Sequence, residues 1–455
     1  MSPVAPALSA LRAAFGDDRI ATGTAISPKH HSDMSAVNDG MRCAPDAVFR
    51  PRTVIEVSQA LAICHAHGLP VVAQGGLTGL AGGATPSPGA LAISLELLRG
   101  IEEIDPAAAT ITVKAGTPLE EVQLAAREAG FFLGLDLGSR GTCQIGGNLS
   151  TNAGGIRVIR YGMARDQVLG LEAVLADGTV ISALNKMQKN NAGYDLKQLF
   201  IGSEGTLGLI TRAVLKLHPA PPSLTTALCG VARYADVVAL LRQAQAQIGL
   251  MAFEGLWQDY HLFNSEALNV LPFADSHSFW VLLESESPSD EVEAFLGTVL
   301  EDGLIQDCVI ATSEQQARAM WSVRDGHPID LLPNIVNFDI SLPIGQIGDF
   351  AEACGAALKT HWPAGHAFFY GHIGDSNLHV STSVDYAPGE DMHTVDEIVY
   401  GVLAQFNGSI SAEHGIGTLK RPYLGQSRSP AELALMRSLK AALDPKGLLN
   451  PGKVI

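Results

Sequence analysis

Apolar positions along the first half of the chain alternate between helical and strand-like spacing. Val54, Val57, Leu61 and Cys64 recur at helical spacing, and Gly68 with Pro70 ends that segment before the apolar run at residues 71–73. This pattern predicts a helix, a turn and a buried strand. Further strands are predicted at residues 91–95, 110–114, 168–175, 179–182 and 207–217, with a helix at residues 118–129 that has Thr117 as its N-cap.

The second half repeats short apolar strands separated by amphipathic segments. Strands are predicted at residues 225–231, 279–284, 309–312, 337–342, 367–372 and 378–383, and helices at residues 290–300 and 347–358. We expect an antiparallel sheet with helices on one face, and an α+β fold for the whole chain. Because residues 218–223 contain three prolines, we place a domain boundary there, between residues 42–220 and 221–455. The C-terminal segment is expected to return to the first domain.

Composition narrows the class of protein. The chain has 455 residues and a net charge of −17, and no stretch concentrates Lys and Arg, so nucleic acid is not an expected partner. Every apolar run is shorter than the roughly 18 residues that a membrane span needs. Residues 1–20 resemble neither a secretory signal nor an Arg-rich transit peptide, so a cytoplasmic location is expected. The six cysteines form no CxxC pair and are interpreted as mostly buried free thiols.

Glycine is concentrated in one part of the chain. Between Gly75 and Gly208 lie 23 of the 47 glycines. They gather in the loop QGGLTGLAGG at residues 74–83 and in two further stretches rich in Gly, Ser, Thr and Asn, at residues 135–155 and 201–210. Backbone amides in such loops can hold an anionic group, although one such loop alone fits a tight surface turn equally well. Three of them together predict a backbone-lined groove for an extended polyanionic ligand.

A second chemical signal is the stretch FFYGHIGDSNLHVS at residues 368–381. If residues 374–377 form the turn of a hairpin, His372 pairs with His379, and their Cβ atoms lie about 4.5 to 5.5 Å apart. Two imidazoles at this distance can bind one divalent ion, and the carboxylate of Glu413 would complete a three-ligand site. The alternative is that these are ordinary hydrogen-bonded or exposed histidines, and the residues alone do not decide between the two.

The glycine-rich stretches resemble those of a known family. Residues 135–155, 161–177 and 191–208 are similar to the D-2-hydroxyacid dehydrogenase branch of the vanillyl-alcohol oxidase and para-cresol methylhydroxylase superfamily, and the resemblance continues to Ile455. It implies a two-subdomain FAD-binding domain and an antiparallel-sheet substrate-capping domain covered by helices. No His or Cys lies in residues 74–83, so we expect non-covalent FAD, with Cys143 as the one other possible attachment. The implied FAD-binding residues are Gln74, Gly75, Gly76, Leu77, Thr78, Gly79, Leu80, Gly138, Ser139, Gly146, Gly147, Asn152, Gly154, Gly205 and Ile210.

The same resemblance assigns roles in the second half. It implies a divalent metal on His372, His379 and Glu413, with zinc preferred and manganese or iron as alternatives. His414 is implied as the catalytic base. The implied substrate-binding residues are Arg324, Asn337, Ser381 and Lys420. For Arg324, a surface arginine is the alternative interpretation.

The resemblance leaves the substrate open. Where D-2-hydroxyglutarate enzymes have Thr, Lys and Asn, this chain has Pro328, Asn337 and Ser381, and the missing Lys removes a cation that a second carboxylate would need. D-lactate and D-2-hydroxyglutarate therefore compete as substrates, followed by glycolate. The expected electron acceptor is an electron-transfer flavoprotein, a cytochrome or a quinone, and a homodimer is possible.

Two other classes remain open from the residues. Two His and one Glu also suit a metallohydrolase whose Gly-rich half holds a nucleotide. A non-catalytic flavin-binding sensor is the third hypothesis.

Overall fold

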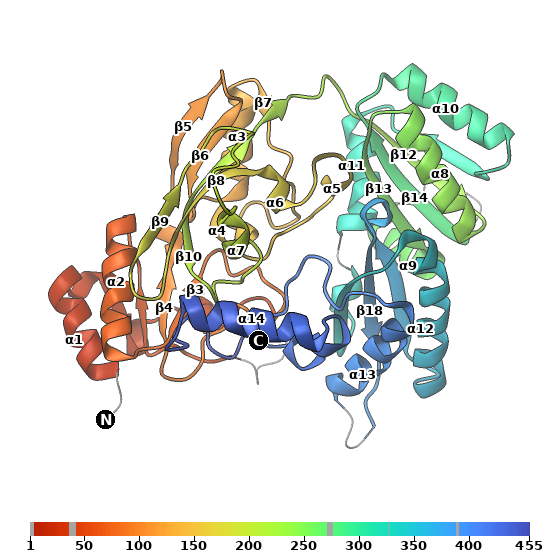
Figure 1. The fold of residues 1–455 in the computed structure, drawn as a ribbon. Coiled ribbons are helices and arrows are strands. Elements are labelled where there is room, and N and C mark those ends of the chain that lie inside the picture. Colours follow the sequence, from red (N-terminus) through yellow and green to blue (C-terminus); the bar gives the residue numbers. More distant parts are fainter. Residues whose placement is uncertain (1–3, 36–41, 271–275, 327, 388–390) are drawn as a thin grey trace. The chain divides into compact units, whose positions relative to one another are not determined.

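The computed structural model describes residues 4–35, 42–270, 276–326, 328–387 and 391–455. These residues form two compact units (Figure 1). Unit 1 comprises residues 1–154, 161–220 and 413–455, and unit 2 comprises residues 155–160 and 221–412. Each unit therefore contains segments that are distant in the sequence.

The first part of unit 1 is a four-stranded sheet with two helices. Its strands, in spatial order, are β1 (Ile20–Thr22), β2 (Ala47–Phe49), β4 (Leu91–Ser94) and β3 (Val71–Gln74), and the last three run parallel. Residues of α1 (Val4–Phe15) and α2 (Val54–His67) share one buried apolar core with these strands. The Thr53 side chain caps the start of α2, and Gly68 ends it in the left-handed conformation, which confirms the predicted helix, turn and strand.

The second part of unit 1 is a five-stranded antiparallel sheet. Its order is β5 (Ile101–Asp105), β6 (Thr110–Lys114), β10 (Leu209–Lys216), β8 (Val168–Val174) and β9 (Val180–Ala183). Its core includes residues of α3 (Leu119–Glu128) and α4 (Ile145–Ser150). The predicted N-cap of α3 is wrong, because Pro118 occupies that position. The Thr117 hydroxyl instead donates to the carbonyl of Lys114 at 2.7 Å.

Smaller elements complete unit 1. These are α6 (Ala164–Gln167), α7 (Lys197–Phe200), the strand pair β7 (Phe131–Phe132) and β11 (His218–Pro219), and α14 (Pro430–Leu443). A capping box formed by Ser429 and Glu432 starts α14. Asn450, beyond α14, accepts a hydrogen bond from the Ala73 amide and donates to the carbonyl of Glu204 at 2.6 Å. The C-terminal segment therefore joins β3 to the third glycine-rich loop.

Unit 2 is built on one seven-stranded antiparallel sheet. Its spatial order is β15 (Asp307–Ile310), β12 (Thr225–Val231), β14 (Phe279–Ser285), β13 (Leu250–Trp257), β17 (His366–Gly371), β18 (Asn377–Ser383) and β16 (Ile335–Ser341). Six of these strands were predicted to within about two residues, and β13 was missed.

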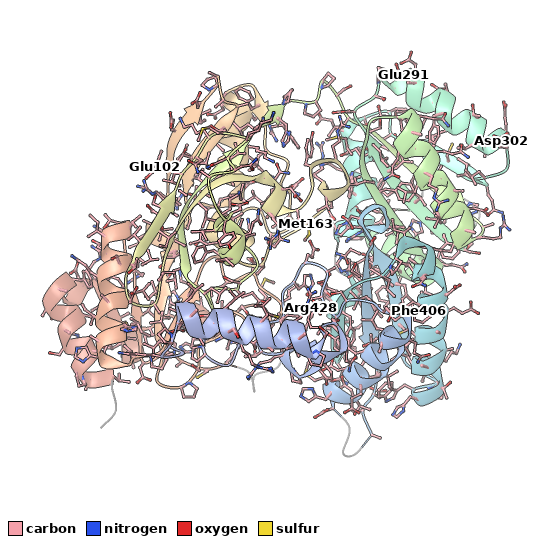
Figure 2. All side chains as sticks on the ribbon, viewed as in Figure 1. Glu102, Met163, Glu291, Asp302, Phe406 and Arg428 are labelled. Carbon is pink, nitrogen blue, oxygen red and sulfur yellow. The ribbon has the colours of Figure 1, made fainter. Side chains whose placement is uncertain are left out.

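Helices cover both faces of this sheet. On one face, Tyr234 of α8 (Tyr234–Gln247) packs on Trp257, and Tyr400 of α13 (Met392–Leu403) packs on Phe338. Here α12 (Ile347–His361) lies against β17, and α10 (Ser289–Glu301) lies beside α8 with polar residues such as Glu291 at the surface (Figure 2). On the other face, Tyr260 of α9 (Gln258–Leu268) stacks on Tyr370, and α11 (Glu314–Asp325) adds Met320 to the same core. The expectation of helices on one face was therefore incomplete.

The α+β class is confirmed by these sheets and helices. Within the described ranges, no helix combines the length and apolar character that crossing a membrane requires. All six cysteines are free thiols, and four of them are buried, as predicted.

Candidate active site

The three glycine-rich loops of unit 1 pack closely against one another. A Cβ at Gly76 would lie 2.1 Å from the carbonyl oxygen of Thr142, so only glycine allows these two loops to approach. The third loop joins them through the Glu204 amide, which donates to the carbonyl of Ser150 at 2.8 Å. By contrast, a Cβ at Gly138 or Gly147 would meet no described atom within 4 Å. These positions offer bare backbone with space in front of it.

Buried polar side chains hold the first loop in place. Gln74 Nε2 donates to the carbonyls of His30 and Ala84, both at 3.0 Å, and Gln74 Oε1 accepts a hydrogen bond from His30 Nδ1 at 2.8 Å. Asp33 accepts a hydrogen bond from the Ala84 amide at 3.2 Å. These hydrogen bonds use the polar atoms of the Gln74 side chain, which therefore stabilises the loop. A ligand would contact the backbone of the segment that follows, Gly75 to Leu80.

Other predicted FAD-binding residues occupy three local settings. Gly146 and Gly147 lie in α4, and Asn152 has a left-handed backbone with φ of 52° just after it. The Asn152 side chain accepts a hydrogen bond from the Arg165 amide. Ile210 is buried in the core of the five-stranded sheet, so only its backbone can contact a ligand.

Cys143 is buried in the same core. Its Sγ accepts a hydrogen bond from Asn148, and burial raises the pKa of the thiol. A buried thiol of raised pKa forms little of the reactive thiolate. This environment disfavours a covalent bond to the flavin.

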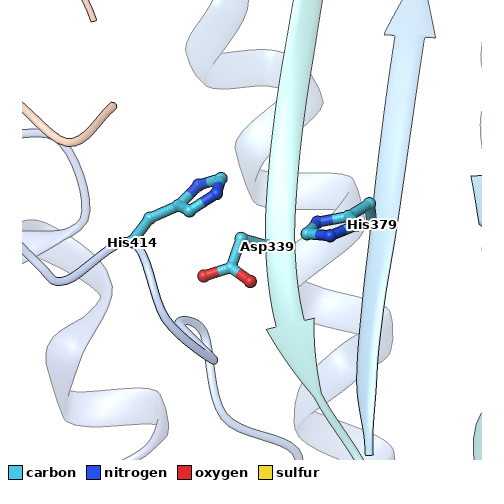
Figure 3. A group of neighbouring side chains, drawn as sticks. All are labelled: Asp339, His379 and His414. Atoms are coloured by element: carbon cyan, nitrogen blue, oxygen red, sulfur yellow. The ribbon is translucent and has the colours of Figure 1, made fainter. Parts of the chain in front are cut away.

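Most of the candidate metal-binding and substrate-binding residues of unit 2 lie on one face of its sheet. Because side chains alternate along a strand, residues opposed across neighbouring strands share a face. Asp339 of β16 is paired with His379 of β18, and His379 is paired with Tyr370 of β17. Figure 3 shows Asp339 and His379 on their neighbouring strands. Ligand atoms of Asp339 and His379 lie within 4.8 Å of each other.

The predicted hairpin register is wrong by two residues. Tyr370, and not His372, is opposite His379, because β17 ends at Gly371 and residues Ile373–Asp375 form a 3-10 turn. His372 is the N-cap of this turn, and its carbonyl accepts a hydrogen bond from the Asn377 amide. The turn nevertheless brings the two imidazoles together, with ring centroids 5.3 Å apart and ligand nitrogens within 4.8 Å.

A buried carboxylate, Glu254 of β13, lies between two predicted site residues. Its Oε1 is 2.7 Å from His372 Nδ1, and its Oε2 accepts a hydrogen bond from Arg324 Nε at 2.7 Å. Burial alone would raise the pKa of Glu254, but the nearby His372 and Arg324 outweigh it and lower that pKa to about 2. Burial lowers the pKa of His372, and Glu254 outweighs this to raise it to about 9. Burial also lowers the pKa of Arg324, and the nearby Glu254 carboxylate outweighs this and raises it.

Arg324 is a buried residue near the end of α11 and is not on the surface. Its guanidinium carbon lies 5.0 Å from the centroid of the Tyr370 ring, which is a cation–π distance. Its NH2 group lies 3.4 Å from His372 Nε2. The alternative interpretation of Arg324 as a surface arginine is therefore wrong.

Asn337 and Ser381 are cross-strand partners farther along the same face. The Ser381 hydroxyl donates to Asn337 Oδ1 at 2.6 Å and lies 3.3 Å from the Tyr370 hydroxyl. The Asn337 amide donates to Asp330 at 3.3 Å. This strip of hydrogen-bonding groups therefore ends at a carboxylate.

Glu413, His414 and Lys420 belong to unit 1. Glu413 accepts a hydrogen bond from the Gly154 amide at 3.2 Å. The same segment is fixed farther on by buried Glu204, which accepts hydrogen bonds from the amides of Ile416 and Gly417. Burial raises the pKa of Glu204, against the opposing effect of these amides. Lys420 is buried near Glu204.

Sequence reasoning missed four polar residues around these sites: Glu204, Glu254, Asp339 and Asn450. Glu254 had a signal, because it is the single charged residue in the apolar run at residues 250–257. Asp339 lies within a predicted strand. The Ala412 amide donates a hydrogen bond to it at 3.0 Å, and the sequence does not indicate this partner. Glu204 and Asn450 act through contacts with distant parts of the chain.

Comparison with known families defines the class of protein. Residues 220–454 match the C-terminal domain of FAD-linked oxidases, and residues 45–183 match an FAD-binding domain. The chain belongs to the family of FAD-linked oxidases and is an FAD-linked oxidoreductase.

Curated relatives are similar over most of the chain. A mitochondrial D-2-hydroxyglutarate dehydrogenase of Bos taurus is 39% identical over 431 residues, which cover 91% of this chain and 78% of the relative. A D-2-hydroxyglutarate dehydrogenase of Xanthomonas citri pv. viticola is 39% identical over 430 residues, which cover 90% of this chain and 89% of the relative.

Solved structures share the fold at low identity. An alkyldihydroxyacetonephosphate synthase has a TM-score of 0.76 at 17% identity, covering 98% of this chain and 84% of the other. A p-cresol methylhydroxylase structure has a TM-score of 0.76 at 18% identity, covering 98% and 96%. These neighbours confirm the fold expected for the superfamily.

Proposed function

We propose that this protein oxidises a D-2-hydroxy acid to the 2-oxo acid, using FAD and a divalent metal ion. The observation that carries this proposal is the cluster of His372, His379 and Arg324 on one face of the unit 2 sheet. The curated relatives support the same chemistry through their names.

The backbone of unit 1 fits FAD. A Cβ at Gly138 or Gly147 would meet no described atom within 4 Å, so both positions offer open backbone, and the braced segment Gly75 to Leu80 supplies further backbone amides. Such amides suit the pyrophosphate of a dinucleotide. Since Cys143 is buried, non-covalent binding is the simplest arrangement.

The donor set of unit 2 fits a divalent ion such as zinc. His372 Nδ1 faces Glu254, so a metal ion would bind at Nε2, which in this structure lies 3.4 Å from an Arg324 NH2 group. A ligand nitrogen of His379 lies within 4.8 Å of a ligand nitrogen of His372, so one ion can contact both imidazoles. Glu413, the third proposed ligand, follows Ala412 directly in the chain, and the Ala412 amide donates a hydrogen bond to Asp339 of the unit 2 sheet.

The residues of this chain then have separate tasks. Arg324 binds the substrate carboxylate through its guanidinium. His414, two residues beyond Ala412, removes the proton of the C2 hydroxyl. When bound, the metal ion would supply a positive charge that favours ionisation of that hydroxyl, and FAD would supply the acceptor for the hydride of C2.

Turnover with an artificial dye acceptor tests this function. We expect D-2-hydroxy acids to reduce the dye and their L enantiomers to be at least about a hundredfold slower, because the carboxylate and hydroxyl contacts fix which face of C2 meets the flavin. A protein that is colourless near 450 nm and hydrolyses a phosphate or peptide ester would instead favour the metallohydrolase. Yellow protein that no 2-hydroxy acid reduces would favour a flavin sensor.

Substrate size depends on the strip beyond Tyr370. Asn337 and Ser381 are neutral, and Asp330 places a carboxylate beside Asn337. A distal carboxylate of the substrate would gain no charge pair from Asn337, Ser381 or Asp330, and a charge-assisted hydrogen bond contributes about 1.5 to 3 kcal/mol. We therefore propose that D-lactate is used with a kcat/KM at least comparable to that of D-2-hydroxyglutarate. The names of the relatives favour D-2-hydroxyglutarate as the second candidate.

The Asn337→Lys variant tests the substrate preference. A lysine at this position adds a cation beside the distal end of the substrate, so kcat/KM for D-2-hydroxyglutarate should rise roughly tenfold relative to that for D-lactate. Asn337→Gln, which adds length without charge, is the matched control. A hundredfold preference of the unmodified enzyme for D-2-hydroxyglutarate would contradict the proposal and would assign the distal carboxylate to another cation, such as Arg324.

A further inference from the structure

We propose that Glu254 is a positioning residue that sets the orientation and tautomer of His372 and the orientation of Arg324. This inference rests on the proposed function, because it concerns how the metal and the substrate carboxylate are held.

The contacts of Glu254 are direct and buried. One carboxylate oxygen is 2.7 Å from His372 Nδ1, and the other is 2.7 Å from Arg324 Nε. Glu254 is 1% exposed, and both of its partners are also buried. Water therefore cannot easily replace the carboxylate, and both partners take their geometry from the same side chain.

The carboxylate also fixes which imidazole nitrogen can bind a metal. An ionised carboxylate only accepts hydrogen bonds, so His372 keeps a proton on Nδ1, and Nε2 is the nitrogen that would give up its proton to bind a metal ion. Carboxylate partners of metal-binding histidines act in this way, and their removal typically lowers metal affinity by 10 to 100-fold.

Tyr370 and Tyr260 complete the support of Arg324. The Tyr370 ring lies under the guanidinium at 5.0 Å and stacks on the Tyr260 ring at 4.0 Å. The Tyr260 hydroxyl donates to the carbonyl of Arg324 at 2.9 Å. Glu254 fixes the Nε edge of the guanidinium, so the group has one favoured orientation on the aromatic pair.

Glu254→Gln gives a sharp test, because glutamine is nearly isosteric but has one acceptor and one donor. Arg324 Nε always donates, so the amide oxygen must face Arg324 and the NH2 group must face His372 Nδ1. His372 would then carry its proton on Nε2, where the metal has to bind. We expect the dissociation constant for Zn²⁺, measured by chelator competition on the metal-stripped, flavin-loaded protein, to rise at least tenfold.

Glu284→Gln is the matched control. Glu284 is another buried glutamate on the same face of the sheet, and it forms an ion pair with Arg157 and accepts a hydrogen bond from the Trp321 indole. Both variants remove a charge from a buried Arg–Glu pair, so both should lower the melting temperature. Only Glu254→Gln should weaken Zn²⁺ binding, with Glu284→Gln within about threefold of the unmodified protein.

A second variant separates the two tasks of Glu254. At saturating Zn²⁺, Glu254→Gln retains an acceptor for Arg324, so KM for the hydroxy acid should change less than about threefold. Glu254→Ala removes both contacts, so KM should also rise at least tenfold. Equal Zn²⁺ affinity in Glu254→Gln and the unmodified protein, or equal losses in Glu254→Gln and Glu284→Gln, would overturn the inference. Failure of the unmodified protein to bind Zn²⁺ would overturn it together with the metal site of the proposed function.

Discussion

Replacing His379 by Ala is expected to lower the rate of flavin reduction by a D-2-hydroxy acid about a thousandfold or more. His379 supplies one of two imidazoles whose ligand nitrogens lie within 4.8 Å, and an ion held by fewer ligands is bound weakly. The lost charge stabilisation is worth several kcal/mol. Stopped-flow absorbance near 450 nm measures the rate, and elemental analysis measures the bound metal. His372→Ala should give the same pattern.

Flavin content separates a metal site from a structural role. The glycine-rich loops lie in unit 1 and both histidines lie in unit 2, so bound FAD should stay near normal in both variants. His393→Ala, which changes an exposed histidine of unit 2, is the control and should keep both metal and rate. Loss of flavin together with metal in both variants would show that His372 and His379 are structural.

His414→Gln is expected to slow flavin reduction by about 100 to 10,000-fold, the usual contribution of a general base. Glutamine keeps much of the size and polarity of the side chain but cannot accept the hydroxyl proton. Bound metal, bound flavin and KM should remain within about threefold of the unmodified enzyme, because the proposed ligands and Arg324 are untouched.

Chemical rescue gives a second readout for His414. Added imidazole should restore part of the lost rate in a smaller variant, His414→Ala, if proton removal is the missing step. A variant that retains more than about a tenth of the rate would assign the base to another residue, with Asp339 the first to examine because it is paired with His379.

Local patterns predicted many of the regular elements, although strands β1, β2 and β5 of unit 1 were missed. The helix at Val54–His67 has both an N-cap and a terminal glycine in the sequence, and the paired strands of unit 2 are short apolar runs. The glycine-rich loops were also predictable, because close backbone approach, as at Gly76, requires that residue type.

The sequence failed where long-range contacts override local pattern. Strand β13 was missed, and with it Glu254, whose role depends on residues 70 and 118 positions away. The hairpin register failed because residues 373–375 form a 3-10 turn, so the strand ends one residue before His372. The imidazoles of His372 and His379 are nevertheless close, because His372 at the start of the turn places its ring near His379.

Contacts between distant segments were also out of reach. Asp339 fixes Ala412 from 73 residues away, and Asn450 joins β3 to Glu204. The spacing of residues along the sequence does not indicate such pairs, because they form only when distant segments fold together.

Anaerobic mixing of the enzyme with a single D-2-hydroxy acid tests the central proposal most directly. We predict that D-lactate or D-2-hydroxyglutarate bleaches the 450 nm absorbance of the metal-loaded enzyme, that the matching L enantiomer does not, and that removing the metal with a chelator stops bleaching until Zn²⁺ or Mn²⁺ is restored. A flavin that stays oxidised with every D-2-hydroxy acid, or that bleaches at the same rate without metal, would contradict the proposal.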